Sequence, residues 1–247
     1  MKKTKAFSHV ANFTGYMAVV ADYLSGLGKA GRILDLPAGN GLISDRLREM
    51  GHEVVSGDIN RERPDYHYVD MSNPLPFADG AFDVVICLEG IEHLLNPVPF
   101  IAELTRVTRG GGLIIISTPN VINFYSRLQF LFTGAPYQFN PANLPAMTND
   151  GAGDRGHVFP LSYFQLRYLF GQHGAQVKAV RGDKWKRKTL LPVYLALLPF
   201  AWLWSRLLFF HQGDEGQPAR NREMFDHLFS APLLLSRSLV LVLEKTA

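Results

Sequence analysis

Short apolar runs rich in β-branched residues alternate with helical patterns through the first two thirds of this 247-residue chain. Apolar runs bounded by turn residues predict buried strands, and their alternation with helices predicts a mainly parallel sheet with helices on both faces. With 47% hydrophobic residues, the chain has enough apolar side chains for one full α/β domain. The predicted strands are residues 32–36, 53–57, 67–69, 83–88, 113–117, 177–181 and 239–243.

The amino-terminal residues and the cysteine content bear on location. The chain starts with positive charges, as signal peptides do, but Ser8, His9, Asn12 and Thr14 interrupt what would be the apolar centre of such a peptide. We therefore expect residues 1–30 to be a helical lead-in. The single cysteine, Cys87, excludes an internal disulfide framework and indicates a reducing compartment, so we expect a cytoplasmic protein.

The stretch ILDLPAGNG, residues 33–41, combines a strand end, a glycine turn and a helix that begins near Leu42. Such a turn brings backbone amides close to a ligand, and Gly39 and Gly41 permit the positive φ angles that it needs. The dinucleotide-binding fingerprint G-x-G-x-x-G is not met, because position 44 is Ser44. A phosphate loop that ends in Gly-Lys-Ser/Thr is absent as well.

The turn resembles the first motif of class I S-adenosylmethionine-dependent methyltransferases, in outline D-x-G-x-G-x-G. Asp35, Gly39 and Gly41 match, whereas Pro37 replaces the first glycine. Further blocks resemble the family in the same order: VVSGDI, YVDMSNPLPF, FDVVICLEGIEHLLNP and RVTRGGGLIIISTPN, which with the turn cover roughly residues 30–120. The resemblance implies a Rossmann-like α/β fold with a seven-stranded, mainly parallel sheet, an antiparallel last strand at 238–244, and S-adenosylmethionine as cofactor.

Cofactor contacts follow from the same blocks. Asp58 comes at the end of the second predicted strand, where an acidic residue can accept both ribose hydroxyls. The resemblance implies that Asp70 meets the adenine amino group, with Met71 beside it as an apolar cover. The residues assigned to the cofactor are Asp35, Pro37, Ala38, Gly39, Gly41, Asp58, Ile59, Asp70, Met71 and Leu88.

Two histidines are candidates for removing a proton from an acceptor hydroxyl, a task that suits a side chain with an unperturbed pKa near 6.5. His93 lies just beyond the carboxyl end of the fourth predicted strand, where open parallel sheets bind ligands. His157 follows a long loop, and family members often have a histidine in this setting, near the mouth of the cofactor pocket. His157 has the alternative role of anchoring the loop by a hydrogen bond.

The pattern E-x-x-E-H at residues 89–93 resembles quinone O-methyltransferases, in which it is associated with a divalent cation. Two carboxylates and an imidazole can hold such an ion and lower the pKa of a coordinated hydroxyl. The resemblance therefore implies a Mg²⁺ site at Glu89, Glu92 and His93. The alternative is that Glu92 and His93 only cap and orient the following helix.

Residues 189–205, TLLPVYLALLPFAWLWS, contain no charge. A bilayer-spanning helix needs about 20 apolar residues, and Pro192 and Pro199 weaken a crossing further. A single crossing would also separate the last strand from its sheet. We expect a pair of helices that dips into a membrane interface, with a lid or dimer helix buried in protein as the alternative. A basic edge precedes the run: Lys184, Lys186, Arg187 and Lys188.

The sequence therefore predicts one methyltransferase domain over residues 1–247. Its parts are the lead-in at 1–30, a cofactor-binding core at 31–135, a substrate-side loop at 136–160, an apolar helical insertion at 185–235 and the last strand. Methyltransferases with this plan resemble those of bacterial cell-envelope and lipid-linked polysaccharide synthesis. We thus expect an O-methyltransferase that acts on a sugar hydroxyl of a membrane-associated glycan or glycolipid, at the inner face of the membrane.

Two further functions stay open. A quinone or isoprenoid O-methyltransferase would explain E-x-x-E-H and the apolar segment and would depend on a divalent cation. A non-catalytic, membrane-peripheral protein that binds S-adenosylmethionine would explain Pro37 in the cofactor turn. Nucleic acid is not expected as a partner, because the net charge is only +3 and the basic residues form no stripe with interleaved aromatics.

Overall fold

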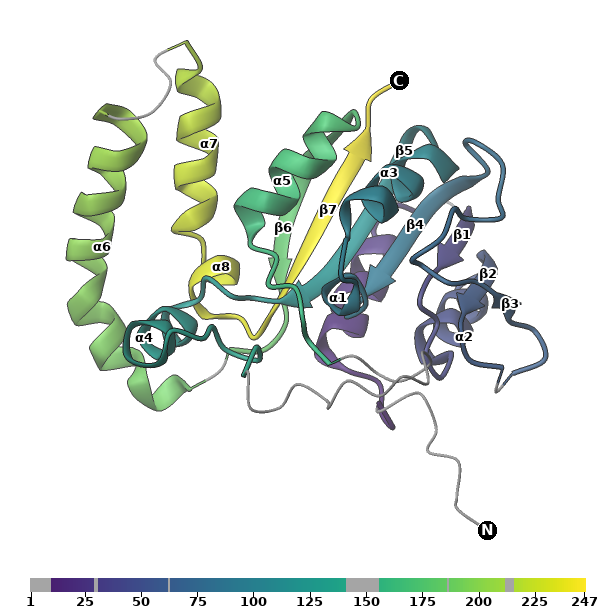
Figure 1. The fold of residues 1–247 in the computed structure, drawn as a ribbon, viewed down its shortest axis with the longest axis horizontal. Helices are drawn as coiled ribbons and strands as arrows, with labels where there is room; N and C mark the ends of the chain where they lie inside the picture. Colours follow the sequence, from purple (N-terminus) through teal and green to yellow (C-terminus); the bar gives the residue numbers. More distant parts are fainter. Residues whose placement is uncertain (1–9, 29–30, 62, 141–155, 186, 212–215) are drawn as a thin grey trace.

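The computed structural model describes residues 10–28, 31–61, 63–140, 156–185, 187–211 and 216–247. Its centre is a seven-stranded sheet in the order β3-β2-β1-β4-β5-β7-β6 (Figure 1). The strands are β1 (Arg32–Asp35), β2 (Glu53–Asp58), β3 (His67–Tyr68), β4 (Phe82–Leu88), β5 (Thr108–Pro119), β6 (Ala175–Gly182) and β7 (Ser238–Lys245). All seven predicted strands are confirmed, and β7 runs antiparallel to both of its neighbours.

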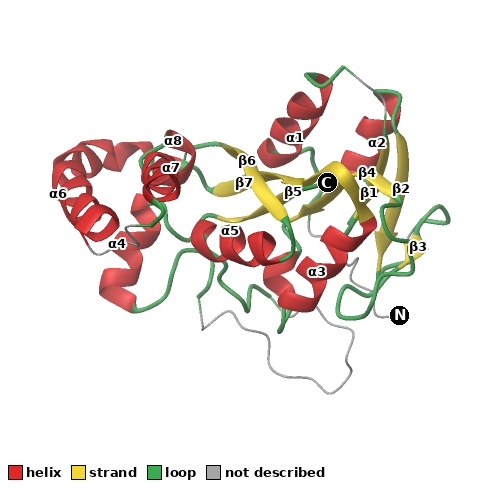
Figure 2. Ribbon diagram, turned by 90° about the horizontal axis from the view of Figure 1, so that it is seen from above, coloured by secondary structure: helices red, strands yellow, loops and turns green. Residues whose placement is uncertain are grey.

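Helices cover both faces of the sheet (Figure 2). On one face lie α1 (Gly15–Ser25) and α2 (Leu42–Glu49), whose apolar side chains share a cluster with β1, β4, β5 and β7. On the other face lie α3 (Val98–Val107) and α5 (Tyr163–Gln172), which pack into a second cluster. The central strands are therefore buried on both faces, which explains their almost unbroken apolar sequences. The Rossmann-like α/β fold class is confirmed.

The predicted lead-in and the predicted loop are described only in part. Helix α1 lies inside the lead-in at 1–30, while residues 1–9 and 29–30 of that prediction are outside the described residues. In the same way, residues 141–155 of the substrate-side loop at 136–160 are outside them, and its two ends are described.

The segment between β6 and β7 is helical. It contains a short 3-10 turn, η3 (Lys188–Leu190), followed by α6 (Leu191–His211), α7 (Pro218–Leu228) and α8 (Ala231–Leu235). Helices α6 and α7 stand side by side, away from the sheet, next to α4 (Phe124–Thr133) (Figures 1 and 2). The chain leaves the sheet and returns to it at one place, because Gly182 at the end of β6 pairs with Leu239 at the start of β7.

The prediction of a pair of helices for residues 189–205 is wrong, because α6 is one continuous helix with Pro199 inside it. Pro192 sits in the first turn, where a missing amide hydrogen costs little. Pro199 removes a single hydrogen bond, which is not enough to end a 21-residue helix rich in leucine and alanine and packed against α7.

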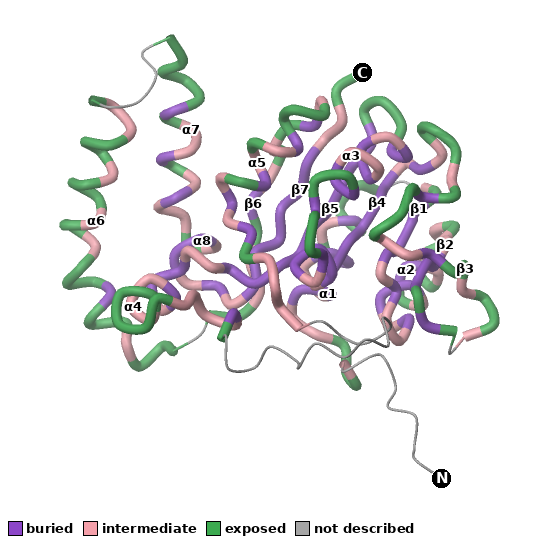
Figure 3. The backbone as a smooth tube through the Cα atoms, viewed as in Figure 1, coloured by how far each residue is buried: buried purple, intermediate pink, exposed green. Residues whose placement is uncertain are grey.

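Residues Lys188–His211 form a helix that is long and apolar enough to cross a membrane by length and composition, and only 6% of its most apolar window is buried. Figure 3 shows α6 largely as exposed or partly exposed tube. A single crossing is incompatible with the fold, because β6 and β7 on either side of the insertion are neighbours in one sheet. Helix α6 therefore presents an apolar surface on the same side of any membrane as the rest of the domain.

Candidate functional site

The glycine turn after β1 has the conformation that its residues predict. Gly39 has φ 56° and Gly41 has φ 81°, both in the left-handed region that favours glycine. The amide of Ala38 donates to the carbonyl of Gly57 at 2.9 Å and so ties the turn to β2. A side chain at Gly41 would collide with the guanidinium of Arg63, which lies over the turn.

Pro37, where the sequence departs from the family motif, packs against the turn that follows β4. A Cβ atom on Gly90 would lie 2.5 Å from Cδ of Pro37, so the two turns approach each other more closely than any side chain at position 90 would allow. Gly90 therefore accommodates the proline ring, and the two left-handed glycines of the β1 turn keep their conformation.

Asp58, at the end of β2, holds this turn in place by hydrogen bonds. Its Oδ2 accepts the amide hydrogen of Gly39 at 2.7 Å, and its Oδ1 accepts that of Asn60 at 2.9 Å. The side-chain amide of Asn60 in turn donates to the carbonyl of Gly39 at 3.1 Å. Burial raises the pKa of Asp58, and these backbone donors oppose that rise. Each carboxylate oxygen has a second lone pair, so Asp58 can still accept a ribose hydroxyl.

Asp35 is fully buried at the end of β1. Its Oδ2 accepts the hydroxyl hydrogen of Ser44 at 2.5 Å, and Oγ of Ser44 lies 2.7 Å from that of Ser56. Its Oδ1 has no hydrogen-bond partner among the described residues. Burial raises the pKa of Asp35 to about 7, and the nearby charge of Asp58 adds to the rise. Ser44, the residue that breaks the dinucleotide fingerprint, is thus the hydroxyl donor to Asp35.

The other residues assigned to the cofactor lie at the carboxyl ends of β1 to β4. Asp70, after β3, accepts the amide hydrogen of Ser72 at 2.8 Å and a side-chain hydrogen of Asn73 at 2.9 Å, so both of its oxygens serve its own turn. Among the assigned apolar residues at this edge, Ile59, which follows β2, is exposed. The others are partly to fully buried: Ala38, Met71 and Leu88.

The E-x-x-E-H residues occupy the turn after β4. Glu89 has φ 50°, a left-handed conformation, and its Oε1 accepts the hydroxyl hydrogen of Ser117 on β5 at 2.6 Å. Glu92 lies in η1 (Ile91–His93) and is fully buried. Its Oε2 accepts the hydroxyl hydrogen of Thr118 at 3.1 Å, and its Oε1 has no hydrogen-bond partner among the described residues.

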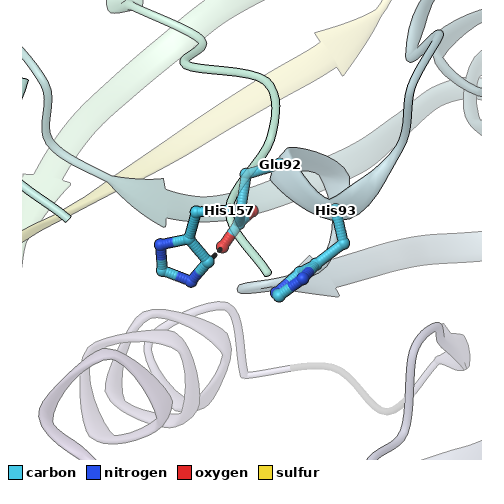
Figure 4. A group of neighbouring side chains, drawn as sticks. All are labelled: Glu92, His93 and His157. Atoms are coloured by element: carbon cyan, nitrogen blue, oxygen red, sulfur yellow. Dashed lines mark ion pairs between the residues drawn. The ribbon is translucent and has the colours of Figure 1, made fainter. Parts of the chain in front are cut away.

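His93 and His157, the two candidate bases, lie next to each other (Figure 4). Their ring centroids are 5.0 Å apart, at an interplanar angle of 79°. Nε2 of His157 is 4.0 Å from Oε1 of Glu92. The amides of Val158 and Phe159 both donate to the backbone carbonyl of Glu92, which brings the segment after the long loop to the end of β4.

These contacts define the candidate site as Glu92, His93 and His157, whose ligand atoms all lie within 4.8 Å of one another. The predicted metal ligands Glu89, Glu92 and His93 differ from this group at one position. Glu89 is outside it, because its left-handed backbone and its bond to Ser117 direct its carboxylate towards β5.

The central part of the chain, residues 34–116, matches the family model of the methyltransferase domain. This core is thus similar to the S-adenosylmethionine-dependent methyltransferases. The chain is 40% identical over 100 residues to a demethylmenaquinone methyltransferase of Beutenbergia cavernae, which covers 36% of this chain and 42% of that protein. It is 31% identical over 135 residues to a ubiquinone biosynthesis O-methyltransferase of Dechloromonas aromatica, covering 49% and 56%. The matches thus span about half the length of these relatives.

The fold of the methyltransferase domain extends beyond that core. A crystal structure of a SAM-dependent methyltransferase from Archaeoglobus fulgidus superposes with a TM-score of 0.57 over 93% of this chain and 92% of that chain, at 16% identity. At that identity the likeness concerns the fold alone. It includes both the sheet and the segments after β5, for which the family model has no match.

The residues around the turn after β1 fit S-adenosylmethionine. The buried Oδ1 of Asp35 lacks a donor, which is rare for a buried polar atom and is resolved by a ligand that brings a hydrogen or a positive charge. The sulfonium and ammonium of the cofactor supply such charge. Gly39, Gly41 and Asp58 provide close backbone approach and a hydroxyl acceptor beside it.

The candidate site fits Mg²⁺ less well. Magnesium favours oxygen ligands, whereas the group of Glu92, His93 and His157 offers one carboxylate and two imidazoles. Burial raises the pKa of Glu92 well above its ordinary value, and the charge of Glu89 adds to the rise. The described residues of this group therefore do not suit a magnesium ion.

Sequence reasoning missed several side chains around the methyltransferase site. Thr118, which donates to Glu92, could have been found, because it lies at the carboxyl end of a predicted strand. Tyr16 of α1 gave no such signal. Its pKa is raised by burial and by the charges of Glu89 and Glu92, so α1 contributes to the electrostatics of the site. Gln138, whose carbonyl lies 3.1 Å from Nδ1 of His157, was hidden in the long loop.

Proposed function

We propose that this protein transfers the methyl group of S-adenosylmethionine to a hydroxyl oxygen of a membrane-held acceptor. The observation that carries the proposal is the pairing of Glu92 with His157, beside His93, at the same edge of the sheet as the glycine turn. In the reaction the sulfur–methyl bond breaks as the oxygen–methyl bond forms. The products are a methyl ether and S-adenosylhomocysteine, and the hydroxyl proton must go to the protein.

His157 is the base that the contacts favour. Its Nδ1 lies 3.1 Å from the carbonyl of Gln138, which favours a hydrogen on Nδ1 and leaves Nε2 to accept the proton. Nε2 lies 4.0 Å from Oε1 of Glu92, so a Glu92 carboxylate that has lost its proton, which its raised pKa opposes, would stabilise the imidazolium that forms. His93, whose ring packs on that of His157, is the second candidate.

Two acceptor classes are proposed. The relative named as a ubiquinone biosynthesis O-methyltransferase supports a quinol, whose phenolic hydroxyl loses its proton more readily than a sugar hydroxyl does. The sequence supports a sugar hydroxyl of a glycan or glycolipid through the segments around TPN and His157. Both classes are held by lipid, and both require the enzyme to work at a membrane surface.

Helix α6 supports peripheral membrane contact. Most of its large apolar side chains are exposed, among them Phe200 at 74% and Trp204 at 77%. The exposed Phe132, at the end of neighbouring α4, extends this apolar surface. Lys184, Arg187 and Lys188 lie where the insertion begins and can face anionic lipid. We propose that the protein works in the cytoplasm at the inner face of the membrane, with residues 185–210 at the lipid surface.

The test has two stages. Calorimetric titration with S-adenosylmethionine and S-adenosylhomocysteine, with and without Mg²⁺, should give micromolar binding that Mg²⁺ does not change. The protein is then incubated with methyl-labelled cofactor and membrane extracts, and the labelled product is identified by mass spectrometry. A labelled quinol or a labelled glycolipid decides between the acceptors.

Other results would contradict the proposal. Binding without labelling of any extract would favour the non-catalytic alternative, and no binding of either ligand would remove the enzyme function. A requirement for Mg²⁺ would show that the cation belongs to the reaction in spite of the two imidazoles.

A further inference from the structure

A cavity lies outside the candidate site, between α4, α5 and the α6–α7 pair. Its volume is about 400 Å³, within the range of small-molecule sites. Its apolar wall includes Ile122, Phe164, Phe209 and Leu228, and its polar wall consists of Arg127 and Ser205. Ser205 and Phe209 come from α6 and Leu228 is the last residue of α7, so the apolar insertion builds one side of the cavity.

Arg127 is the unusual member of this wall. Its Nε donates to the carbonyl of Ile122 at 2.6 Å, and its guanidinium lies over the ring of Phe124 with the centroid 5.5 Å away. Among the described residues, no carboxylate forms an ion pair with it. Several other partly buried arginines are paired with carboxylates, as Arg167 is with Glu223 at 2.8 Å. The wall of the cavity therefore carries a positive charge that the described part of the protein does not neutralise.

Two features of the surroundings oppose that charge. Burial lowers the pKa of Arg127, and no neighbouring acid offsets the effect. Arg127 also lies in the first turn of α4, where the positive end of the helix dipole faces it. The attraction of an anion beside the guanidinium would offset both effects. The fork of an arginine fits phosphate oxygens in a bidentate manner.

We propose that this cavity binds an amphiphile, with a phosphate group at Arg127 and an apolar chain between α5, α6 and α7. The apolar wall excludes a free phosphate as the preferred ligand, and the unpaired guanidinium disfavours a neutral lipid. The phosphate can belong to a membrane phospholipid or to a lipid-linked acceptor. The site itself does not depend on methyl transfer, and only its use for an acceptor rests on the proposed function.

Its position supports such a role. Ile122, in the wall of the cavity, follows Thr118 by four residues, and Thr118 contacts Glu92 in the candidate site. The carboxyl end of β5 therefore contacts the candidate site, and the segment that follows it lines the cavity. A chain held in the cavity would keep its attached headgroup near the end of the sheet where the candidate site lies.

The first experiment measures binding of dodecyl phosphate below its critical micelle concentration, by calorimetry, without cofactor. Wild type should bind it, and Arg127→Gln should bind it at least tenfold more weakly. Arg206→Gln is the matched control, since Arg206 is an exposed arginine on α6 that lies over Trp202 and does not line the cavity. The control should bind as wild type does.

Two further ligands test the two ends of the site. Dodecyl maltoside should bind more weakly than dodecyl phosphate and equally to wild type and Arg127→Gln. Inorganic phosphate alone should show no binding at the same concentrations. Wild-type affinity of Arg127→Gln for dodecyl phosphate, or inorganic phosphate binding as tightly as the amphiphile, would overturn the proposal.

A second variant tests the site independently, in case Arg127→Gln does not fold. Ser205→Phe fills the cavity from a partly exposed position on α6 and should abolish binding of dodecyl phosphate while the melting temperature stays unchanged. If a stable Ser205→Phe protein binds as wild type does, the cavity is not the site.

The source of the ligand is found by displacement of bound dodecyl phosphate. Displacement by phosphatidylglycerol vesicles assigns the site to membrane lipid. Displacement by a polyprenyl phosphate and not by the vesicles assigns it to a lipid-linked acceptor. Failure of both to displace the probe would overturn the proposal. Because no cofactor is present, these results are separate from success or failure of methyl transfer.

Discussion

Two buried carboxylates at the same edge of the sheet are held in opposite ways. Asp58 accepts two backbone amide hydrogens, from Gly39 and Asn60, and both of its oxygens are engaged. Glu92 has one hydroxyl donor, Thr118, and an Oε1 that accepts no hydrogen bond within the described part of the chain and lies 4.0 Å from Nε2 of His157. Asp58 is held in place by the backbone before any ligand arrives, whereas Glu92 has an acceptor to spare for a proton or a cation.

The difference indicates that the two carboxylates, Asp58 and Glu92, have different roles. A carboxylate with fixed backbone donors keeps its position, and those donors oppose the rise in pKa that burial causes, which suits recognition of a constant cofactor. A carboxylate with a strongly raised pKa changes its charge with its surroundings, which suits proton transfer. Four changes test this contrast, in order of the expected effect.

Glu92→Gln should have the largest effect, because glutamine keeps a bond to Thr118 but cannot carry the charge that stabilises protonated His157. We expect the methyl-transfer rate to fall by about 100-fold or more, as is typical for loss of acid–base catalysis, with cofactor affinity unchanged. Rates are measured with labelled cofactor. Glu89→Gln is the companion variant and should lose less, because Glu89 bonds to Ser117 outside the group. Equal losses would contradict the contrast.

Asp58→Ala should weaken cofactor binding rather than the chemical step. The change leaves the amides of Gly39 and Asn60 without their acceptor and removes the acceptor for ribose hydroxyls. Each hydrogen bond to a charged group contributes about 1.5 to 3 kcal/mol, so the dissociation constant should rise by at least about tenfold. Titration calorimetry measures it, and Asp58→Asn should show a smaller rise. Unchanged affinity in the alanine variant would remove the ribose role.

Asp35 should make cofactor binding depend on pH. Its raised pKa of about 7 means that a proton must leave before the carboxylate can attract the positively charged cofactor. The ionised fraction rises about tenfold between pH 6 and pH 8, so affinity should rise with pH across that window by up to the same factor. Asp35→Asn keeps an acceptor for Ser44 and should lose this dependence. Any pH dependence that comes from titration of the ligand itself remains in the Asp35→Asn variant, which therefore serves as the control. An identical pH profile of affinity for wild type and variant would refute the role of Asp35.

The smallest effect is expected far from the carboxylates. Trp204→Glu on α6 should reduce binding to phosphatidylglycerol vesicles several-fold and change the free energy of unfolding by no more than about 0.5 kcal/mol, because Trp204 is exposed. Ala219→Glu on exposed α7 is the control and should sediment with vesicles more nearly as wild type does. Equal vesicle binding by both variants would argue against α6 as the membrane surface.

The fold and the cofactor edge could be predicted because their signals are local. Each strand is a short apolar run, and Asp35, Gly39, Gly41 and Asp58 stand directly at strand ends. The acceptor side depends on contacts between distant segments. The sequence names His93 and His157 as rivals, and only folding shows that their rings touch.

The continuity of α6 also depends on contacts between distant segments. Pro199 would interrupt an isolated helix, whereas packing against α7 keeps α6 continuous through this residue. The cavity beside Arg127 has no sequence signal at all, since its wall combines the segment after β5 with α4, α5, α6 and α7.

The pairing of Gly182 with Leu239, continued by the bridge between Trp185 and Ser236, makes the α6–α7 pair a module with a single insertion point. A short hairpin turn in its place would close the sheet without altering the order of the strands. If residues 185–210 contact lipid and the cavity holds the acceptor, as proposed, membrane attachment and choice of acceptor can be exchanged between related enzymes as a unit, while the half that holds the cofactor stays as it is. Chimaeras that swap this module would transfer acceptor preference without redesign of the catalytic edge.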